Sequence, residues 1–226
     1  MADEVADIRQ LTIGVLGGTG PQGKGLALRW AKAGLKVVIG SRKADRAEAT
    51  AEELRASAEV EHISGADNLA CATQADVVLV AVPWEGHGEL LESLRDALAG
   101  KIVIDCVNPL GFDKQGPFAL PVAAGSAAQQ AAALLPDSRV VAAFHHVSAV
   151  LLADLSVTDL HTDVLVLGDD RAATDLVRAL ADTVPGMRGV FGGRLRNAHQ
   201  VEAFTANLIA INRRYKAHAG IKVTDV

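Results

Sequence analysis

The chain has 226 residues, of which 50% are hydrophobic and 22% charged, and its formal net charge is −5. This length suits one compact unit, or one domain with a small appendage, because single cores grow to roughly 250 residues. The acidic balance gives no reason to expect a nucleic-acid partner. The first ten residues are polar and acidic, and no apolar run approaches the roughly 20 residues of a membrane span. We therefore expect a cytoplasmic protein with no secretory signal and no membrane partner.

The thiol and imidazole side chains show no spacing typical of a disulfide or a metal centre. Cys71 and Cys106 each lie in or beside an apolar stretch, without a second thiol or a histidine at ligand spacing. The seven histidines lack H-x-x-x-H and H-x-x-E-H spacing. We expect two buried free thiols and no metal site.

Short β-branched runs alternate with amphipathic stretches, a pattern typical of βαβ units around a parallel sheet. In the first half of the chain, strands are predicted at residues 12–16, 36–39, 60–63, 76–82 and 101–107, and helices at 23–33, 44–58 and 88–98. Residues 111–121 are rich in glycine and proline and predict a loop. Beyond them, strands are predicted at 139–144, 163–167 and 188–191, and helices at 126–135, 171–182 and 197–215.

A G-x-G-x-x-G motif follows the first strand and opens the first helix, from Gly18 to Gly23. Gly18 permits a tight turn, Gly20 lets a pyrophosphate approach the backbone, and Gly23 lets helix and strand pack closely. Free N–H groups at the helix N-terminus bind the phosphates. A simple turn is the alternative, but the strand, turn, helix, strand context favours dinucleotide binding. The sequence therefore predicts an α/β fold with a Rossmann-type doubly wound parallel sheet.

The end of the second strand indicates which dinucleotide binds. An NAD enzyme places Asp or Glu there to bind the ribose 2′-hydroxyl, whereas this chain has Gly-Ser-Arg-Lys at residues 40–43. Ser41 can donate a hydrogen bond to a 2′-phosphate, and Arg42 can pair with that phosphate while stacking on adenine. Arg46 lies one helical turn later. A solvated basic helix start is the alternative, but cations are unfavourable at a helix N-terminus. The pattern favours NADP(H).

Three segments resemble the NADPH-dependent reductases of the deazaflavin coenzyme F420: GVLGGTGPQGKGLALRWAKAGLKVVIGSRKADRAEA, VPWEGH and FHHVSA. The resemblance covers most of the chain and is strongest over residues 12–110. It implies reversible hydride transfer between C4 of the nicotinamide and C5 of the deazaflavin. It also implies an NADP-binding domain over residues 1–150 and a smaller C-terminal part, residues 151–226, that completes the deazaflavin cleft.

The resemblance also implies a set of cofactor-binding residues. By position they would hold the pyrophosphate and ribose (Gly18, Thr19, Gly20, Pro21 and Gln22), the 2′-phosphate (Ser41, Arg42 and Arg46), the nicotinamide (Val82, Pro83 and Trp84) and the junction of nicotinamide and deazaflavin (His145, Val147 and Ala149). Hydride transfer between two cofactors needs proximity, stacking and exclusion of water more than proton transfer. No catalytic side chain is therefore predicted.

Two of these positions have a second interpretation. His145 and His146 follow the strand at 139–144, so they lie either in a surface loop with one satisfied imidazole or at the strand end where ligands of parallel sheets gather. Trp84 is either a packing residue or a stacking platform.

Other functions remain open from the sequence. An NADPH-dependent imine or keto-acid reductase of the same superfamily would append a large helical domain, and only 58 residues follow residue 168. A non-enzymatic NADP(H) sensor could share the glycine loop. The single tyrosine, Tyr215, precedes Lys216 directly, which argues against the Tyr-x-x-x-Lys dyad of short-chain dehydrogenases. A homodimer is predicted because the Ala-rich stretch at 123–135 and the last helix can bury apolar surface.

Overall fold

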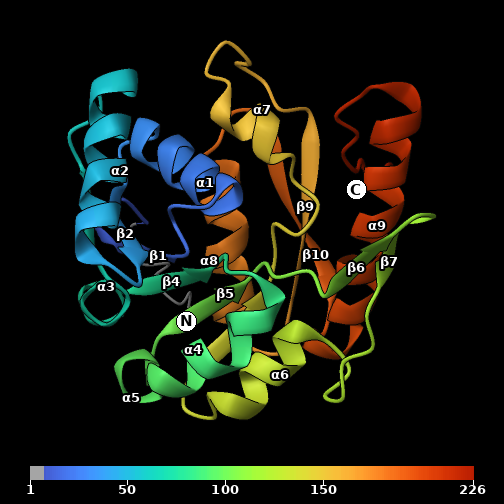
Figure 1. Cartoon of the computed structure of the whole chain (residues 1–226), viewed down its shortest axis with the longest axis horizontal. Coiled ribbons are helices and arrows are strands. Elements are labelled where there is room, and N and C mark those ends of the chain that lie inside the picture. The colour runs from blue at the N-terminus through green and yellow to red at the C-terminus, as the bar shows by residue number, and fades with distance from the viewer. Residues whose placement is uncertain (1–7) are drawn as a thin grey trace.

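The structure is a computed structural model that describes residues 8–226, so most of the acidic start of the chain lies outside the described part. One large sheet forms its centre. The strands of this sheet are β1 (Thr12–Leu16), β2 (Lys36–Ser41), β3 (Ile63–Asp67), β4 (Val77–Val80), β5 (Ile102–Asp105), β8 (Arg139–Ala142), β9 (Thr162–Gly168) and β10 (Met187–Gly193). Their order across the sheet is β10-β9-β8-β5-β4-β1-β2-β3 (Figure 1).

Six neighbouring strands run parallel to one another, namely β3, β2, β1, β4, β5 and β8. The next strand, β9, pairs antiparallel with β8 and parallel with β10. The order reverses direction around β1, as in a doubly wound sheet. The predicted α/β fold with a parallel sheet is confirmed, with one antiparallel junction at β8 and β9.

Helices cover both faces of the sheet (Figure 1). One face carries α1 (Pro21–Lys32), α2 (Ala44–Ala58), α7 (Ala149–Ala153) and α8 (Arg171–Asp182). The other carries α3 (Asn68–Gln74), α4 (His87–Ser93), α5 (Arg95–Leu98), α6 (Ala127–Leu134) and α9 (Ala198–Tyr215). Short 3-10 turns occur at Ile8–Gln10, Trp84–Gly86 and Leu195–Asn197. Each face therefore closes its own apolar cluster against the sheet, which explains why β4 is buried along its whole length.

Both cysteines lie in the core, as predicted from their apolar surroundings. Burial raises the pKa of Cys71 to about 12 and the pKa of Cys106 well above its ordinary value. Both thiols therefore stay protonated and unreactive near neutral pH.

The predicted loop at residues 111–121 is wrong, because a hairpin forms there from β6 (Leu110–Asp113) and β7 (Gly116–Ala119). The carboxylate of Asp113 accepts hydrogen bonds from the backbone N–H groups of Gln115 at 2.7 Å and Gly116 at 3.1 Å. Gly116 adopts a positive φ of 123°, which a side chain would oppose. The hairpin lies alongside α9 (Figure 1).

Several predicted boundaries are also corrected. The strand predicted at 60–63 begins at Ile63, because Glu59 ends α2 with a φ of 52° and the chain first pairs with β2 four residues later. The helix predicted at 88–98 is interrupted at Leu94 and forms α4 and α5. The strand predicted at 139–144 ends at Ala142, since Phe144 has a φ of 66°. Helices α3 and α7 were not predicted.

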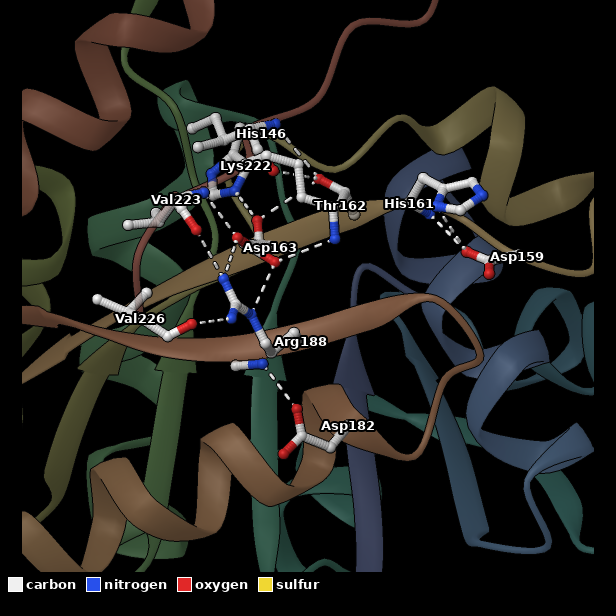
Figure 2. A network of polar contacts seen from close by, with 12 residues as sticks. His146, Asp159, His161, Thr162, Asp163, Asp182, Arg188, Lys222, Val223 and Val226 are labelled. Carbon is white, nitrogen blue, oxygen red and sulfur yellow. Dashed lines mark hydrogen bonds and ion pairs between the residues drawn. The ribbon is translucent and has the colours of Figure 1, made fainter.

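The C-terminal tail after α9 returns to the start of β9, where Asp163 lies at the centre of a polar network (Figure 2). The backbone N–H of Asp163 donates to Ile221 O at 2.7 Å, and Val223 N–H donates to the Asp163 carboxylate at 2.7 Å. Arg188 from β10 donates to the same carboxylate at 2.7 Å and to Val226 O at 2.6 Å. The tail is thereby fastened to two strands of the sheet.

Among residues 8–226, no helix is long and apolar enough to cross a membrane.

Candidate functional site

The candidate site lies at the edge of the sheet where the parallel strands have their carboxyl ends. The loops after β1, β2, β3 and β4 meet there and enclose a cavity of about 510 Å³. Its lining residues are Gly17, Thr19, Gly20, Ser41, Arg42, Arg46, Asn68, Ala81, Val82, Pro83, Glu85, Gly86 and Leu90. Ligands of open α/β sheets bind in such a crevice next to the strand where the order reverses, which here is β1.

The glycine loop after β1 is shaped by close backbone contacts. Gly17 has a φ of 75°, and a Cβ there would lie 2.4 Å from Ala81 O, so the tight turn falls on Gly17 and not on Gly18 as predicted. A Cβ on Gly18 would instead meet Ile39 Cγ2 at 2.9 Å. A Cβ on Gly23 would lie 2.9 Å from Gly17 O, which confirms the predicted close packing of α1.

Gly20 is the open position of this loop. A Cβ on it would meet only Gly17 O, at 3.3 Å, within the 4 Å contact range. Gly20 is also the N-cap of α1 and supplies no capping side chain, and Pro21 is the first helical residue. The free N–H groups and positive dipole end of α1 therefore begin at the cavity wall, which suits a phosphate ligand.

Basic side chains lie at the β2 end of the cavity. Ser41 is buried, whereas Arg42 and Arg46 are exposed, and neither guanidinium forms an ion pair with any residue in 8–226. Asn68, the first residue of α3, presents a buried Oδ1 that has no partner among the described residues. Within residues 8–226, the guanidinium groups of Arg42 and Arg46 are therefore available to an anionic ligand, and Asn68 Oδ1 is available to a hydrogen-bond donor.

The opposite wall follows β4. Val82 and Pro83 line the cavity together with Glu85 and Gly86, whereas the Trp84 ring does not. Trp84 is half-buried and lies against His87, with ring centroids 5.5 Å apart and planes tilted by 32°. The indole supports the wall from behind.

The corner after β8 is strained and held from several sides. Phe144 has a φ of 66°, which costs a bulky residue roughly 1–3 kcal/mol. Gln22 Nε2 donates to Phe144 O at 3.1 Å, and Asn108 Nδ2 donates to His145 O at 2.9 Å. The Phe144 ring packs edge-on against Trp30 at 5.5 Å. Gln22 therefore joins the glycine loop to this corner and does not face the cavity.

His145 and His146 are both buried, with exposed fractions of 4%, so the surface-loop alternative is wrong. Neither ring nitrogen of His145 has a partner within residues 8–226. Burial lowers the pKa of His145 to about 4, with a smaller opposing contribution from Asp105. His146 Nε2 donates to Asp163 O at 2.7 Å, and burial lowers its pKa as well. Both imidazoles are neutral near pH 7.

Not all of the predicted residues line the cavity. Thr19, Gly20, Ser41, Arg42, Arg46, Val82 and Pro83 do, and Gly18, Pro21, Gln22, Trp84, His145, Val147 and Ala149 do not. Val147 faces a small crevice against the C-terminal tail, and Ala149 begins α7 beside Gly25 of α1.

Sequence reasoning missed Gly17, Asn68, Ala81, Glu85, Gly86 and Leu90. The rule that ligands gather at strand ends would have pointed to Asn68, since it follows β3 directly. Among the described residues, no three His, Cys, Asp or Glu side chains are arranged to hold a metal ion.

Comparison with known proteins places this chain in a family. The family model for "NADP oxidoreductase coenzyme F420-dependent" matches residues 12–109. The F420-dependent NADP reductase of Methanothermobacter marburgensis is 38% identical over 223 residues, which cover 96% of this chain and 99% of that protein.

Two solved structures share the fold. A candidate F420-dependent NADP reductase from Arthrobacter sp. FB24 superposes with a TM-score of 0.81 at 26% identity, covering 95% of this chain and 99% of the other. Pyrroline carboxylate reductase of Plasmodium falciparum, with NADP bound, has a TM-score of 0.61 at 10% identity, covering 92% and 67%, so it supports the fold alone. The chain belongs to the family of F420-dependent NADP oxidoreductases.

Proposed function

We propose that this oxidoreductase transfers a hydride reversibly between NADP(H) and coenzyme F420, a diffusible co-substrate. The observation that carries the proposal is one cavity that joins the glycine loop, two unpaired guanidinium groups and the end of β4. A dinucleotide with a 2′-phosphate has matching groups: a phosphorylated ribose at one end, a pyrophosphate in the middle and a nicotinamide ring at the other end.

The residues divide by location. Thr19 and Gly20 would hold the pyrophosphate and ribose, and Gly18 and Pro21, which do not line the cavity, would set the shape of this loop. Ser41, Arg42 and Arg46 would hold the 2′-phosphate. Val82 and Pro83 would contact the nicotinamide, with Trp84 behind them. Gln22 would act indirectly, by fixing the glycine loop to the β8 corner, because its amide already donates a hydrogen bond to Phe144 O. The acceptor at Asn68 Oδ1 is suited to a hydroxyl or amino group of the adenosine half.

The chemistry needs positioned rings and little else from the chain. When bound, NADPH supplies a hydride from its nicotinamide and the deazaflavin ring accepts it. His145 is neutral and has no hydrogen-bond partner within residues 8–226, so it can donate or accept one hydrogen bond to a ring amide without adding charge. Val147 and Ala149 follow on the same segment and would border the deazaflavin. His145 and Val147 are both buried, which keeps water away from this corner.

The division of labour between residues 1–150 and 151–226 is also a proposal. Every residue that lines the cavity lies between Gly17 and Leu90. The later part approaches the β8 corner through Thr205 of α9, whose hydroxyl lies 3.3 Å from Asn108 Oδ1. The cytoplasmic location expected from the sequence stays a prediction.

A spectroscopic assay tests the proposal. Purified protein is mixed with NADPH and oxidised F420, and the visible absorbance of the deazaflavin is followed, with NADH as the control. Rapid bleaching with NADPH and slow bleaching with NADH is expected. NADPH binding without any bleaching would point to an imine or keto-acid reductase or to an NADP(H) sensor.

We further propose a homodimer formed by the hairpin and α9. The buried alanines of α6, Ala127, Ala128 and Ala131, already pack in the core of this chain. Large exposed apolar side chains instead gather on the hairpin and α9, namely Phe112, Phe118, Phe204, Ile211 and Tyr215. Light scattering should give twice the chain mass, and Phe204→Ser with Ile211→Ser should halve it. A monomeric wild type would remove this proposal.

A further inference from the structure

A buried polar cluster lies beside the Val82–Gly86 wall of the cavity, and the function proposed above assigns it no role. Its centre is His87, the first residue of α4, which is fully buried. His87 Nε2 lies 2.6 Å from Asp105 Oδ2 at the end of β5, and His87 Nδ1 lies 2.9 Å from Gln130 Oε1 of α6. The second oxygen of Asp105 accepts from Val107 N–H at 3.0 Å.

The two partners of His87 determine its charge. The Gln130 amide is placed with its oxygen towards the ring, so the imidazole faces an acceptor on each side, and an imidazole that donates from both nitrogens is a cation. Burial lowers the pKa of His87, but the hydrogen bond and the charge of Asp105 outweigh burial, and the pKa is raised overall. The geometry and the electrostatics therefore agree on an imidazolium.

The cluster extends to the C-terminal helix. Glu202 of α9 is buried, and its carboxylate accepts from Ala127 N–H at 2.9 Å and from Ala128 N–H at 3.1 Å, at the N-terminus of α6. Gln130 lies one turn further along α6 and holds His87. The imidazole of α4 is thus bonded to β5 and α6, and α9 joins the cluster through the start of α6.

The position of His87 connects this cluster to the cavity. His87 directly follows the Trp84–Gly86 turn, and Glu85 and Gly86 line the cavity. The Trp84 ring lies on the imidazole at 5.5 Å. Any displacement of His87 from Asp105 would therefore move the wall that begins at Val82.

We infer that His87, clamped as an imidazolium between Asp105 and Gln130, is a positioning residue that fixes the Val82–Gly86 wall against the nicotinamide half of the cofactor. The inference rests on the proposed NADP(H) function. It assigns His87 no contact with cofactor or substrate, since His87 does not line the cavity.

The clamp has a predicted pH dependence. The titratable groups that face His87 are Asp105 from β5 and Glu202 from α9, both of which favour the cation when they are ionised. Burial raises the pKa of Glu202 to about 7, so the contribution of Glu202 is lost as the pH falls through that value. His145, from the β8 corner, lies within the electrostatic reach of Asp105 and is itself neutral near pH 7. The clamp is complete below the raised pKa of His87 and loses one hydrogen bond as the pH rises through it.

The first test measures the protonation state directly. In protein labelled with ¹⁵N-histidine, one imidazole should keep two protonated nitrogens to a higher pH than an ordinary histidine, whose pKa is about 6.5. The signal should vanish in the double variant H87Q/D105N and persist in the control H62Q, which removes an exposed histidine. If His87 loses its second proton at or below the pH at which His62 does, the imidazolium assignment is overturned.

The second test measures positioning with two ligands. Replacing His87 alone leaves a buried carboxylate unpaired, so the double variant H87Q/D105N is used because it keeps a neutral hydrogen bond. We expect the Kd for NADPH to rise about tenfold, while the Kd for 2′,5′-ADP, which lacks the nicotinamide, changes by less than about twofold.

The two ligands also separate the possible failures. Equal weakening of NADPH and 2′,5′-ADP would indicate a general structural role and overturn the positioning role. Unchanged NADPH binding would overturn it as well. A wild type that binds both ligands but does not reduce F420 would contradict the proposed function while leaving the ligand comparison valid.

Discussion

His146 donates its Nε2–H to the backbone carbonyl oxygen of Asp163 across 2.7 Å, which joins the proposed cofactor corner to the attachment point of the C-terminal tail. The carboxylate of the same Asp163 is fully buried and binds Arg188 at 2.7 Å and Lys222 at 3.3 Å (Figure 2). One residue therefore supports the neutral imidazole through its backbone and holds the tail through its side chain. The two regions should respond together when Asp163 is changed.

Asp163→Asn should lower the free energy of unfolding at pH 7 by about 1–2 kcal/mol, a value reduced for the solvent exposure of Arg188 and Lys222. The hydrogen bond from Arg188 is the main cause that lowers the pKa of Asp163 to about 2. The stabilisation that the ionised Asp163 carboxylate provides is complete above the ordinary aspartate pKa of about 3.9 and is lost as the pH falls towards 2. Urea unfolding at several pH values measures this difference.

Asp169→Asn is the matched control, because Asp169 pairs with Arg194 on the surface, with side chains 59% and 69% exposed. It should change stability by less than about 0.5 kcal/mol. Hydrogen exchange in residues 217–226 should accelerate only in Asp163→Asn. If both variants lose the same stability at every pH, the buried network is not what holds the tail.

His145→Leu should leave the folded protein as stable as the wild type or more so, because a buried polar ring without partners is replaced by an apolar side chain. The same variant should lose about tenfold or more in kcat, since it removes the hydrogen bond proposed for the ring amide. His146→Leu is the comparison: it breaks the bond to Asp163 O and should cost about 1–3 kcal/mol. Thermal unfolding and steady-state kinetics measure both effects.

A destabilised His145→Leu with unchanged kcat would mean that His145 is a packing residue. The activity of the wild type between pH 6 and pH 8 should show no titration of His145, since its pKa of about 4 lies below that range.

Much of the fold was predictable because the strands carry strong local patterns. The short apolar run of β4 predicts a buried strand. Helix α8 is indicated by Asp170, which caps Ala173 N–H, and by the spacing of Val177 and Leu180, which face the core. The hairpin was not predicted, because its turn depends on the Asp113 carboxylate and on the positive φ of Gly116. The glycine and proline content of this segment indicates only a loop. Short helices such as α3 have too few residues for a period to show.

The candidate site was predictable in part for the same reason. Gly20, Ser41 and Arg42 lie beside strand ends and share one cavity. The buried partners behind the walls follow from tertiary contacts between distant segments. His87 and Asp105 are 18 residues apart, and Asn108 and His145 are 37 apart, so no local pattern joins them.

Gly20→Ala and Gly17→Ala should separate cofactor approach from backbone geometry. At Gly20 the added methyl group meets only Gly17 O at 3.3 Å, so the variant should fold with a loss below about 1 kcal/mol. It should raise the Kd for NADPH about tenfold or more, because the methyl group occupies the side where the pyrophosphate approaches. At Gly17 the methyl group would lie 2.4 Å from Ala81 O at a φ of 75°, so a loss of about 3 kcal/mol or more is expected.

Urea unfolding and NADPH titration of both variants provide the measurement. Gly20→Ala that binds NADPH as tightly as the wild type would show that the phosphates do not approach over this glycine.

Arg42→Ala should raise the KM for NADPH by about 10- to 100-fold, because a charge-assisted hydrogen bond to the 2′-phosphate contributes roughly 1.5–3 kcal/mol. The KM for NADH should change by less than about threefold, since NADH has no phosphate for the guanidinium to bind. Lys43→Ala is the control: Lys43 is an exposed neighbouring cation that does not line the cavity, and its loss tests for a general field effect. If Arg42→Ala weakened both cofactors equally, the guanidinium would act on a group that they share, and Ser41 and Arg46 alone would have to select NADPH.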